Sequence, residues 1–85
     1  MRITKDLVNK RCLVCVRSFL ATYFEDGTQV PFRTDNNPLE ITLLGISSDG
    51  EHTKIRHDLT GKSAWVWTRD IILFDILPSN KKELK

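Results

Sequence analysis

The sequence predicts a single all-β domain, and three observations lead to this prediction. β-Branched and aromatic residues cluster in short runs, and Asp-Gly, Asn-Pro and Thr-Gly pairs typical of turns separate these runs. No window keeps a helical period over about 10 to 12 residues. The 85 residues are 40% hydrophobic and 28% charged, which is the composition of one folded domain. We expect this domain to span residues 1–78, with a flexible polar tail at 79–85.

The first part of the chain predicts one helical turn, one strand and one hairpin. Thr4 can cap a turn within residues 4–9, and the first main strand is expected at 10–19. Asp26-Gly27 is a strong hairpin signal between Tyr23-Phe24 and Gln29-Val30. A further turn is expected at residues 34–38, where the chain reads TDNNP.

The second part predicts four more strands, at residues 39–47, 51–59, 62–68 and 71–77. Asp49-Gly50 and Thr60-Gly61 are the expected turns between the first three of these. The last run, IILFDIL, is apolar on both faces, so we expect it to be a buried strand that closes a barrel. About five main strands result.

Two cysteines and two histidines have the spacing of a zinc site, since the chain contains Cys12-x2-Cys15 and His52-x4-His57. Residues separated by an odd number point to opposite faces of a strand, so each pair should diverge. Leu13 and Val14 also favour extended backbone over the tight turn of a zinc knuckle. We therefore expect Cys12 in the core and Cys15 on a mixed face, with no metal and no cofactor.

The predicted turns set the register of strands 39–47, 51–59 and 62–68. Two-residue turns would place Gly45 opposite Lys54, Leu43 opposite Arg56, Arg56 opposite Trp65 and Lys54 opposite Trp67. One face is then mostly apolar and forms the core side: Thr42, Leu44, Ile46, Thr53, Ile55, His57, Leu59, Ala64 and Val66. The other face combines cations with both tryptophans: Leu43, Gly45, His52, Lys54, Arg56, Asp58, Ser63, Trp65, Trp67 and Arg69. Intramolecular cation-π contacts between these cations and tryptophans are one complete explanation of that face.

A binding surface is the other explanation of the cation and tryptophan face. Aromatic and cationic side chains together suit stacked bases and phosphates, and they are also enriched at protein interfaces. The candidate surface residues, whether for nucleic acid or for a protein partner, are Lys54, Arg56, Lys62, Trp65, Trp67 and Arg69. No phosphate loop, paired acids or nucleophile motif is present, so we predict a protein that is not an enzyme and has no catalytic residues.

Five short strands, a long loop after the first and tight turns between the next three resemble the SH3-like small β-barrels, over residues 10–77. An OB-like barrel is the alternative, although it would normally have a helix between the third and fourth strands. The resemblance implies a role seen among such barrels in bacteria and phages, which often bind nucleic acid or a protein partner. It carries no individual site residues.

Two functional hypotheses follow. The first is a nucleic-acid-binding barrel without sequence specificity, and the second is a protein-interaction module that binds a larger partner through the same face. A homodimer through that face is a third possibility. The formal net charge of +2 is low for a nucleic-acid binder. We read no signal peptide and no membrane span, and therefore expect a cytoplasmic protein.

Overall fold

The computed structural model describes residues 3–17, 22–30 and 38–78 of the chain. Within these residues the regular elements are five strands and two 3-10 turns, in the order η1 (Lys5–Leu7), β1 (Arg11–Val16), β2 (Leu39–Ile46), β3 (His52–His57), β4 (Ser63–Trp67), η2 (Thr68–Asp70) and β5 (Ile71–Ile76). The all-β prediction is confirmed. The predicted strand end at residues 18–19, most of the turn at 34–38 and the tail at 79–85 lie outside the described residues.

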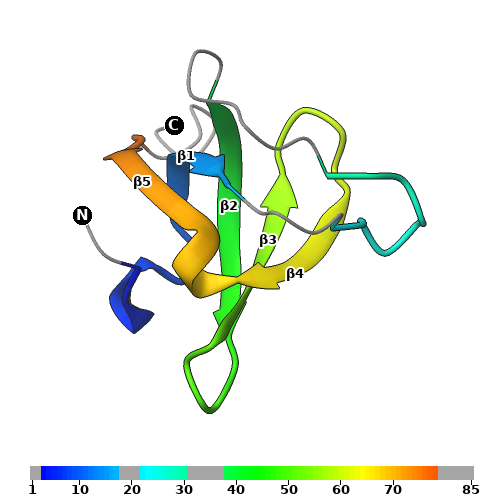
Figure 1. Cartoon of the computed structure of the whole chain (residues 1–85). Helices are drawn as coiled ribbons and strands as arrows, with labels where there is room; N and C mark the ends of the chain where they lie inside the picture. The colour runs from blue at the N-terminus through cyan, green and yellow to red at the C-terminus, as the bar shows by residue number, and fades with distance from the viewer. Residues whose placement is uncertain (1–2, 18–21, 31–37, 79–85) are drawn as a thin grey trace.

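All five strands form one antiparallel sheet in the order β4-β3-β2-β1-β5, shown in Figure 1. The outer strands, β4 and β5, are joined by the three residues of η2 alone. Such a link spans at most about 14 Å, whereas the outer strands of a flat five-stranded sheet lie about 19 Å apart. The sheet therefore curls on itself into a barrel-like shape. β3 and β4 are joined by the five residues 58–62 with no helix, which disfavours the OB-like alternative.

The inside of the curled sheet holds the hydrophobic core. Buried side chains alternate with more exposed ones along β3 and β4, as in a sheet with one face in the core, whereas three consecutive residues are buried in β1 and in β2. Phe24 and Val30, which flank the turn of a hairpin, close the core from outside the sheet. The buried core residues are Leu7, Cys12, Val14, Val16, Phe24, Val30, Leu39, Ile41, Leu43, Ile55, Ala64, Val66, Ile71 and Leu73.

The register between β2 and β3 differs from the prediction in one half of β2. Gly45 lies opposite Lys54 as predicted, but the register shifts between Leu43 and Gly45, so Leu43 lies opposite Ile55 and not opposite Arg56. Leu44 has no partner on β3, which is the geometry of a β-bulge. The bulge turns Leu43 into the core, where it is fully buried, and leaves Leu44 only partly buried. The predicted faces of these two residues were therefore wrong.

The turn between β3 and β4 also differs from the prediction. It occupies residues 58–61, because the N–H of His57 donates to the carbonyl of Lys62 and that of Gly61 donates to the carbonyl of His57. Leu59 consequently sits in the turn with 87% of its surface exposed, and its predicted place in the core was wrong. The shift moves the partner of each β3 residue by two positions along β4. Because two is the period of a strand, the faces of β3 and β4 are unchanged.

β5 is an edge strand and not the buried closing strand that its apolar sequence predicted. It pairs with β1 only, and the register shifts at Phe74, which has no partner on β1. Phe74 and Ile76 are both exposed, whereas Ile71 and Leu73 face the core. The first half of the apolar run therefore contributes to the core, and the second half is exposed to solvent.

Candidate interaction surface

The predicted cation and tryptophan surface exists on the outer side of β3 and β4. Thr53, Ile55, Ala64 and Val66 point into the core, so the residues between them point outward. Trp65 is the most exposed aromatic residue there, with 47% of its surface accessible. We call this set of outward side chains the tryptophan face: His52, Lys54, Arg56, Ser63, Trp65 and Trp67.

Across the tryptophan face the cross-strand neighbours are not the predicted ones. Lys54 lies opposite Trp65, and His52 lies opposite Trp67 with their ring centroids 4.2 Å apart. Arg56 lies opposite Ser63, so neither predicted cation-π pair forms. The tryptophan that does carry a cation is Trp67, because the guanidinium carbon of Arg69 lies 4.7 Å from its ring centroid. The two-position shift in the 58–61 turn is the reason for the exchange of partners.

A hairpin at residues 22–30 packs against one end of the tryptophan face; we call it the acidic hairpin. The predicted turn at Asp26-Gly27 is confirmed, since Tyr23 bridges to Gln29 and the N–H of Phe24 donates to the carbonyl of Thr28. The hairpin is fixed to β4 through Glu25, whose N–H donates to the Ser63 carbonyl over 2.8 Å. Phe24 also stacks on His57, with ring centroids 6.1 Å apart. Buried Phe24 and Val30 hold this hairpin to the barrel.

The acidic hairpin brings two carboxylates to two of the predicted cations. Glu25 Oε2 lies 3.3 Å from the Nζ of Lys54, and Asp26 Oδ2 lies 3.3 Å from the Nζ of Lys62. A hydrogen bond from Ser63, followed by the contact with Lys54, holds the pKa of Glu25 below its ordinary value. Hydrogen bonds from Thr28 and, to a smaller extent, Lys62 lower the pKa of Asp26 in the same way. Both carboxylates are therefore charged at neutral pH, and their charge offsets that of the two lysines.

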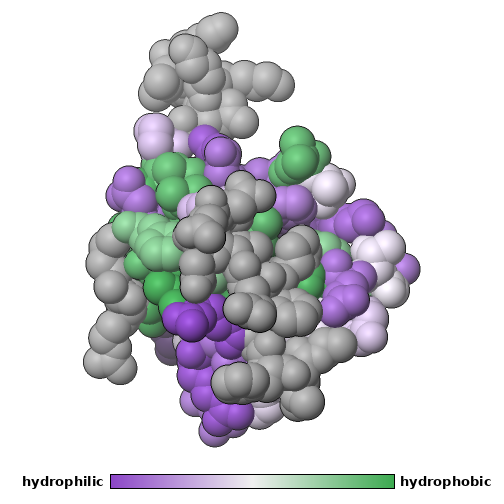
Figure 2. All heavy atoms as spheres, turned by 45° about the horizontal axis from the view of Figure 1, so that its top comes forward, coloured by the Kyte–Doolittle hydropathy of each residue, from purple (hydrophilic) through white to green (hydrophobic). Residues whose placement is uncertain are grey.

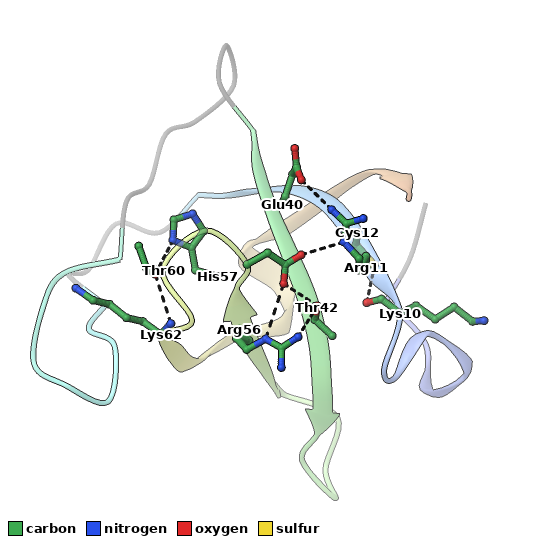
Figure 3. Close-up of polar contacts among 10 residues, drawn as sticks. Lys10, Arg11, Cys12, Glu40, Thr42, Arg56, His57, Thr60 and Lys62 are labelled. Atoms are coloured by element: carbon green, nitrogen blue, oxygen red, sulfur yellow. Dashed lines mark hydrogen bonds and ion pairs between the residues drawn. The ribbon is translucent and has the colours of Figure 1, made fainter. Parts of the chain in front are cut away.

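Arg56 is also engaged by an acid, at the other end of β3. Asp58 Oδ1 lies 3.8 Å from the Nε of Arg56 and accepts a hydrogen bond from the hydroxyl of Thr42 over 2.7 Å. Asp58 Oδ2 accepts a hydrogen bond from the Nε of Arg11 over 3.2 Å, and Arg11 also bonds Glu40. Figure 3 shows Arg11 and Arg56 approaching this carboxylate from different sides, with Thr42 beside it. This network connects β1, β2 and the 58–61 turn, so its first role is structural.

Arg69 differs from the other three predicted cations, Lys54, Arg56 and Lys62. Within the part of the chain that the structure describes, it is exposed and its guanidinium has no carboxylate within ion-pair distance. It lines a cavity of about 520 Å³ at the end of β4, together with Ile3, Gly50, Glu51, Trp67, Thr68 and Ile71. The structure thus brings Trp67 and Arg69 together and separates both from Lys62, which lies beside the acidic hairpin.

The cysteines and histidines occupy separate environments. Cys12 lies in the core as predicted, and burial, with a smaller effect of Asp58, raises the pKa of its thiol. Cys15 is equally buried but lies outside the core cluster. His52 packs on Trp67, whereas His57 hydrogen-bonds the hydroxyl of Thr60 over 3.1 Å. Among the residues described here, no three metal-ligating side chains come together.

The sequence predicted the outward side chains of the tryptophan face, but two exposed hydrophobic residues, Tyr23 and Leu59, were not among the candidate surface residues. Tyr23 is 56% exposed on the acidic hairpin, and Leu59 is exposed in the 58–61 turn. On the side of the molecule seen in Figure 2, hydrophobic surface forms separate islands among hydrophilic residues. One feature of the sequence, the acidic pair Glu25-Asp26 beside a turn, was consistent with the ion pairs that Lys54 and Lys62 form. The acidic pair alone did not indicate which strand the hairpin packs against.

Comparison of the chain with family models, with curated proteins and with solved structures found no match. The arguments about function therefore depend on the residues themselves. In the described ranges, no helix has the length and hydrophobicity that a membrane crossing requires.

Proposed function

We propose that this chain is a protein-interaction module that binds a partner protein through the tryptophan face. The observation that carries the proposal is the balance of charge around an exposed tryptophan. Lys54 and Lys62 each lie 3.3 Å from a carboxylate of the acidic hairpin, whereas Trp65, opposite Lys54, remains half exposed. An exposed tryptophan near charged side chains that already form ion pairs is typical of a protein interface, where aromatic residues supply most of the affinity.

Charge balance also supports the protein-interaction hypothesis over the nucleic-acid hypothesis. Phosphate binding needs cations that can release counterions, and its strength grows with the number of phosphates neutralised. Three of the four predicted phosphate ligands, Lys54, Lys62 and Arg56, already have a carboxylate of this chain within 4.0 Å. Nucleic-acid binding stays a prediction, supported by Arg69 and Trp67, and protein binding is the function that the surface favours.

We further propose that the chain is an SH3-like barrel. The support is the strand order, with β1 between β2 and β5, and the short 3-10 turn that joins β4 to β5.

The test is affinity capture with the full chain from nuclease-treated lysate, followed by direct titration of the purified chain with each captured protein. We expect Trp65→Ala to weaken the titrated affinity by about tenfold or more, as for an interface anchor. Phe74→Ala is the matched control, because Phe74 is an aromatic residue of similar exposure, 42%, on β5. It should leave the affinity within about twofold.

A parallel titration of tryptophan fluorescence with single-stranded and duplex oligonucleotides tests the other hypothesis. Quenching at low salt that disappears as the salt concentration rises, together with no captured protein sensitive to Trp65, would overturn the proposal. A concentration-dependent dimer broken by Trp65→Ala would instead make the partner a second copy of this chain.

A further inference from the structure

The outer edge of β4 carries backbone groups that point away from the sheet. β4 is the last strand on its side of the sheet. The N–H of His57 donates to the Lys62 carbonyl, and that of Thr68 donates to the Glu51 carbonyl, so these two pairs are hydrogen-bonded pairs of the β3-β4 ladder. Hydrogen-bonded and non-hydrogen-bonded pairs alternate in an antiparallel ladder. The N–H and C=O groups of Ser63, Trp65 and Trp67 therefore point outward, and we call them the β4 edge.

Only one position of the β4 edge is occupied in the described part of the chain. The Ser63 carbonyl accepts the N–H of Glu25, a residue of the hairpin turn, over 2.8 Å, so the backbone of another segment can approach this edge. The acidic hairpin does not continue along the edge, because no backbone hydrogen bond joins residues 3–17, 22–30 or 38–78 to the outward groups of Trp65 and Trp67. Two donors and two acceptors are thus left in a row beside an exposed indole ring.

The other edge of the sheet is protected against pairing. β5 contains a bulge at Phe74, which interrupts the row of outward groups. Asp75 is exposed on this edge, and its Oδ1 accepts the N–H of Ile76 over 2.8 Å. Bulges and charged side chains are the usual means by which proteins prevent an edge strand from pairing. β4 has neither a bulge, a proline nor a charged residue among Ser63–Trp67.

We propose that an extended segment of the partner protein adds to the β4 edge as a sixth strand. This inference rests on the proposed function and specifies how the partner binds. Main-chain hydrogen bonds to Trp65 and Trp67 would supply affinity, and alternate side chains of the segment would supply specificity.

Charge and shape determine which segment fits. On the tryptophan face, the added strand has one side chain beside Trp65 and another, two residues away, beside Trp67. Trp67 carries the guanidinium of Arg69, which has no carboxylate partner within the described ranges. The segment therefore carries an Asp or Glu at the position near Arg69 and an apolar or aromatic residue at the position near Trp65.

The first experiment needs no ligand and measures amide hydrogen exchange by NMR in the free full chain. The amides of Trp65 and Trp67 should exchange at least about tenfold faster than those of Ala64 and Val66, which bond β3. Equal protection of all four amides would mean that the β4 edge is already covered, and would overturn the proposal whatever the protein binds.

The second experiment uses a displayed library of random twelve-residue peptides, selected on the full chain and counter-selected on Trp65→Ala. Trp65→Thr, which keeps a good strand former, replaces that variant if it does not fold. We expect selected peptides to carry an acid and an apolar residue two positions apart. Arg69→Gln should remove the preference for the acid while the apolar preference remains.

Synthetic versions of one selected peptide, methylated at one backbone nitrogen at a time, then test the main-chain contact. Methylation at alternate residues, those whose N–H faces β4, should weaken binding by about tenfold or more, and at the intervening residues by much less. Binding also should slow the exchange of the Trp65 and Trp67 amides. A peptide that needs Trp65 but tolerates every methylation would leave the proposed function standing and overturn strand addition. Recovery of no peptide sensitive to Trp65 would count against both.

Discussion

At the scale of single residues, Glu25 joins the acidic hairpin to β3 and β4 through polar contacts. Its N–H donates to the Ser63 carbonyl, its Oε1 accepts the Ser63 hydroxyl over 2.8 Å, and its Oε2 pairs with Lys54. Each side-chain contact favours the ionised carboxylate, so the pKa of Glu25 falls below its ordinary value of 4.5. A depressed carboxylate pKa links the attachment of the hairpin to pH.

The direction of this linkage follows from the sign of the shift. The contribution of Glu25 to stability is fully present above pH 4.5, the ordinary value, and is lost as the pH falls through the lower pKa of the folded state. We expect Ser63→Ala to raise the pKa of Glu25 toward 4.5, because the largest cause of the shift is removed. Carbon-13 NMR of the side-chain carboxyls, titrated between about pH 2 and pH 7, measures this.

Asp49 is the internal control for that titration. Hydrogen bonds from Ser47 and from the N–H of Glu51 lower its pKa, and Ser63 takes no part in them. Its midpoint should therefore be the same in the wild type and in Ser63→Ala. An unchanged Glu25 midpoint in the variant would show that the hydroxyl contact does not exist in solution.

At the scale of the elements, the polar network around Asp58 ties the first three strands of the chain together. Asp58 begins the turn after β3, its N–H donates to the Glu40 carbonyl of β2, and its carboxylate meets Arg11 of β1 and Arg56 of β3. Its side chain is only 19% exposed. A partly buried carboxylate with several donors contributes more than an exposed ion pair does.

Asp58→Asn should therefore destabilise the fold by about 1 to 2 kcal/mol, because two guanidinium groups lose the charge that they share. Glu40→Gln is the matched control: it also meets Arg11, over 2.9 Å, but its side chain is 59% exposed. Its cost should stay at or below about 0.5 kcal/mol. Urea unfolding followed by tryptophan fluorescence measures both. Equal urea midpoints for the two variants would mean that Asp58 contributes no more to stability than Glu40 does.

The elements also show how far the sequence alone could be interpreted. Turn pairs and alternation predicted the five strands and the faces of β3 and β4, because both depend on local chemistry. The bulge at Leu44 was not predictable, since a one-residue shift leaves no mark in an apolar run such as ITLLGI. The 58–61 turn was misplaced because Thr60-Gly61 can also end a longer turn, as it does here with Gly61 at a positive φ of 76°.

For the candidate site, the contacts that could not be predicted are those between residues far apart in the sequence. The outward tryptophans and cations were predicted from alternation, but the pairing of Lys54 with Glu25 joins residues of two elements with no common register. No local pattern encodes such a contact. The burial of Phe24 and Val30, which determines where the acidic hairpin lies, depends on the finished barrel.

At the scale of the whole molecule, the charge of the tryptophan face depends on the acidic hairpin. The formal net charge is +2, and removing the charges of Glu25 and Asp26 would raise it to +4, since 2 + 2 = 4. The change would be local, because both acids lie 3.3 Å from a lysine of the candidate surface. We therefore expect the hairpin to lower the affinity of this surface for polyanions.

The double variant Glu25→Gln with Asp26→Asn should accordingly bind single-stranded oligonucleotides several-fold more tightly than the wild type at low salt. Raising the salt concentration should remove the gain, since it comes from freed cations. Fluorescence titration measures it. Asp6→Asn with Glu40→Gln gives the same net charge with both changes away from the tryptophan face, so it should bind like the wild type. An equal gain in both variants would mean that overall charge, and not the hairpin, controls binding.

The pairing of β1 with β5 has a consequence for how the protein is made. The partners in this ladder, such as Cys12 and Ile76, are 64 positions apart, since 76 − 12 = 64. As the chain leaves the ribosome, the meander of β2, β3 and β4 can form from neighbours, whereas β1 lacks one of its two partners until residues 71–76 emerge. Contacts between distant segments slow folding, so the curled sheet closes only after residues 71–76 have been synthesised. Until then the nascent chain exposes the β1 edge that β5 later covers.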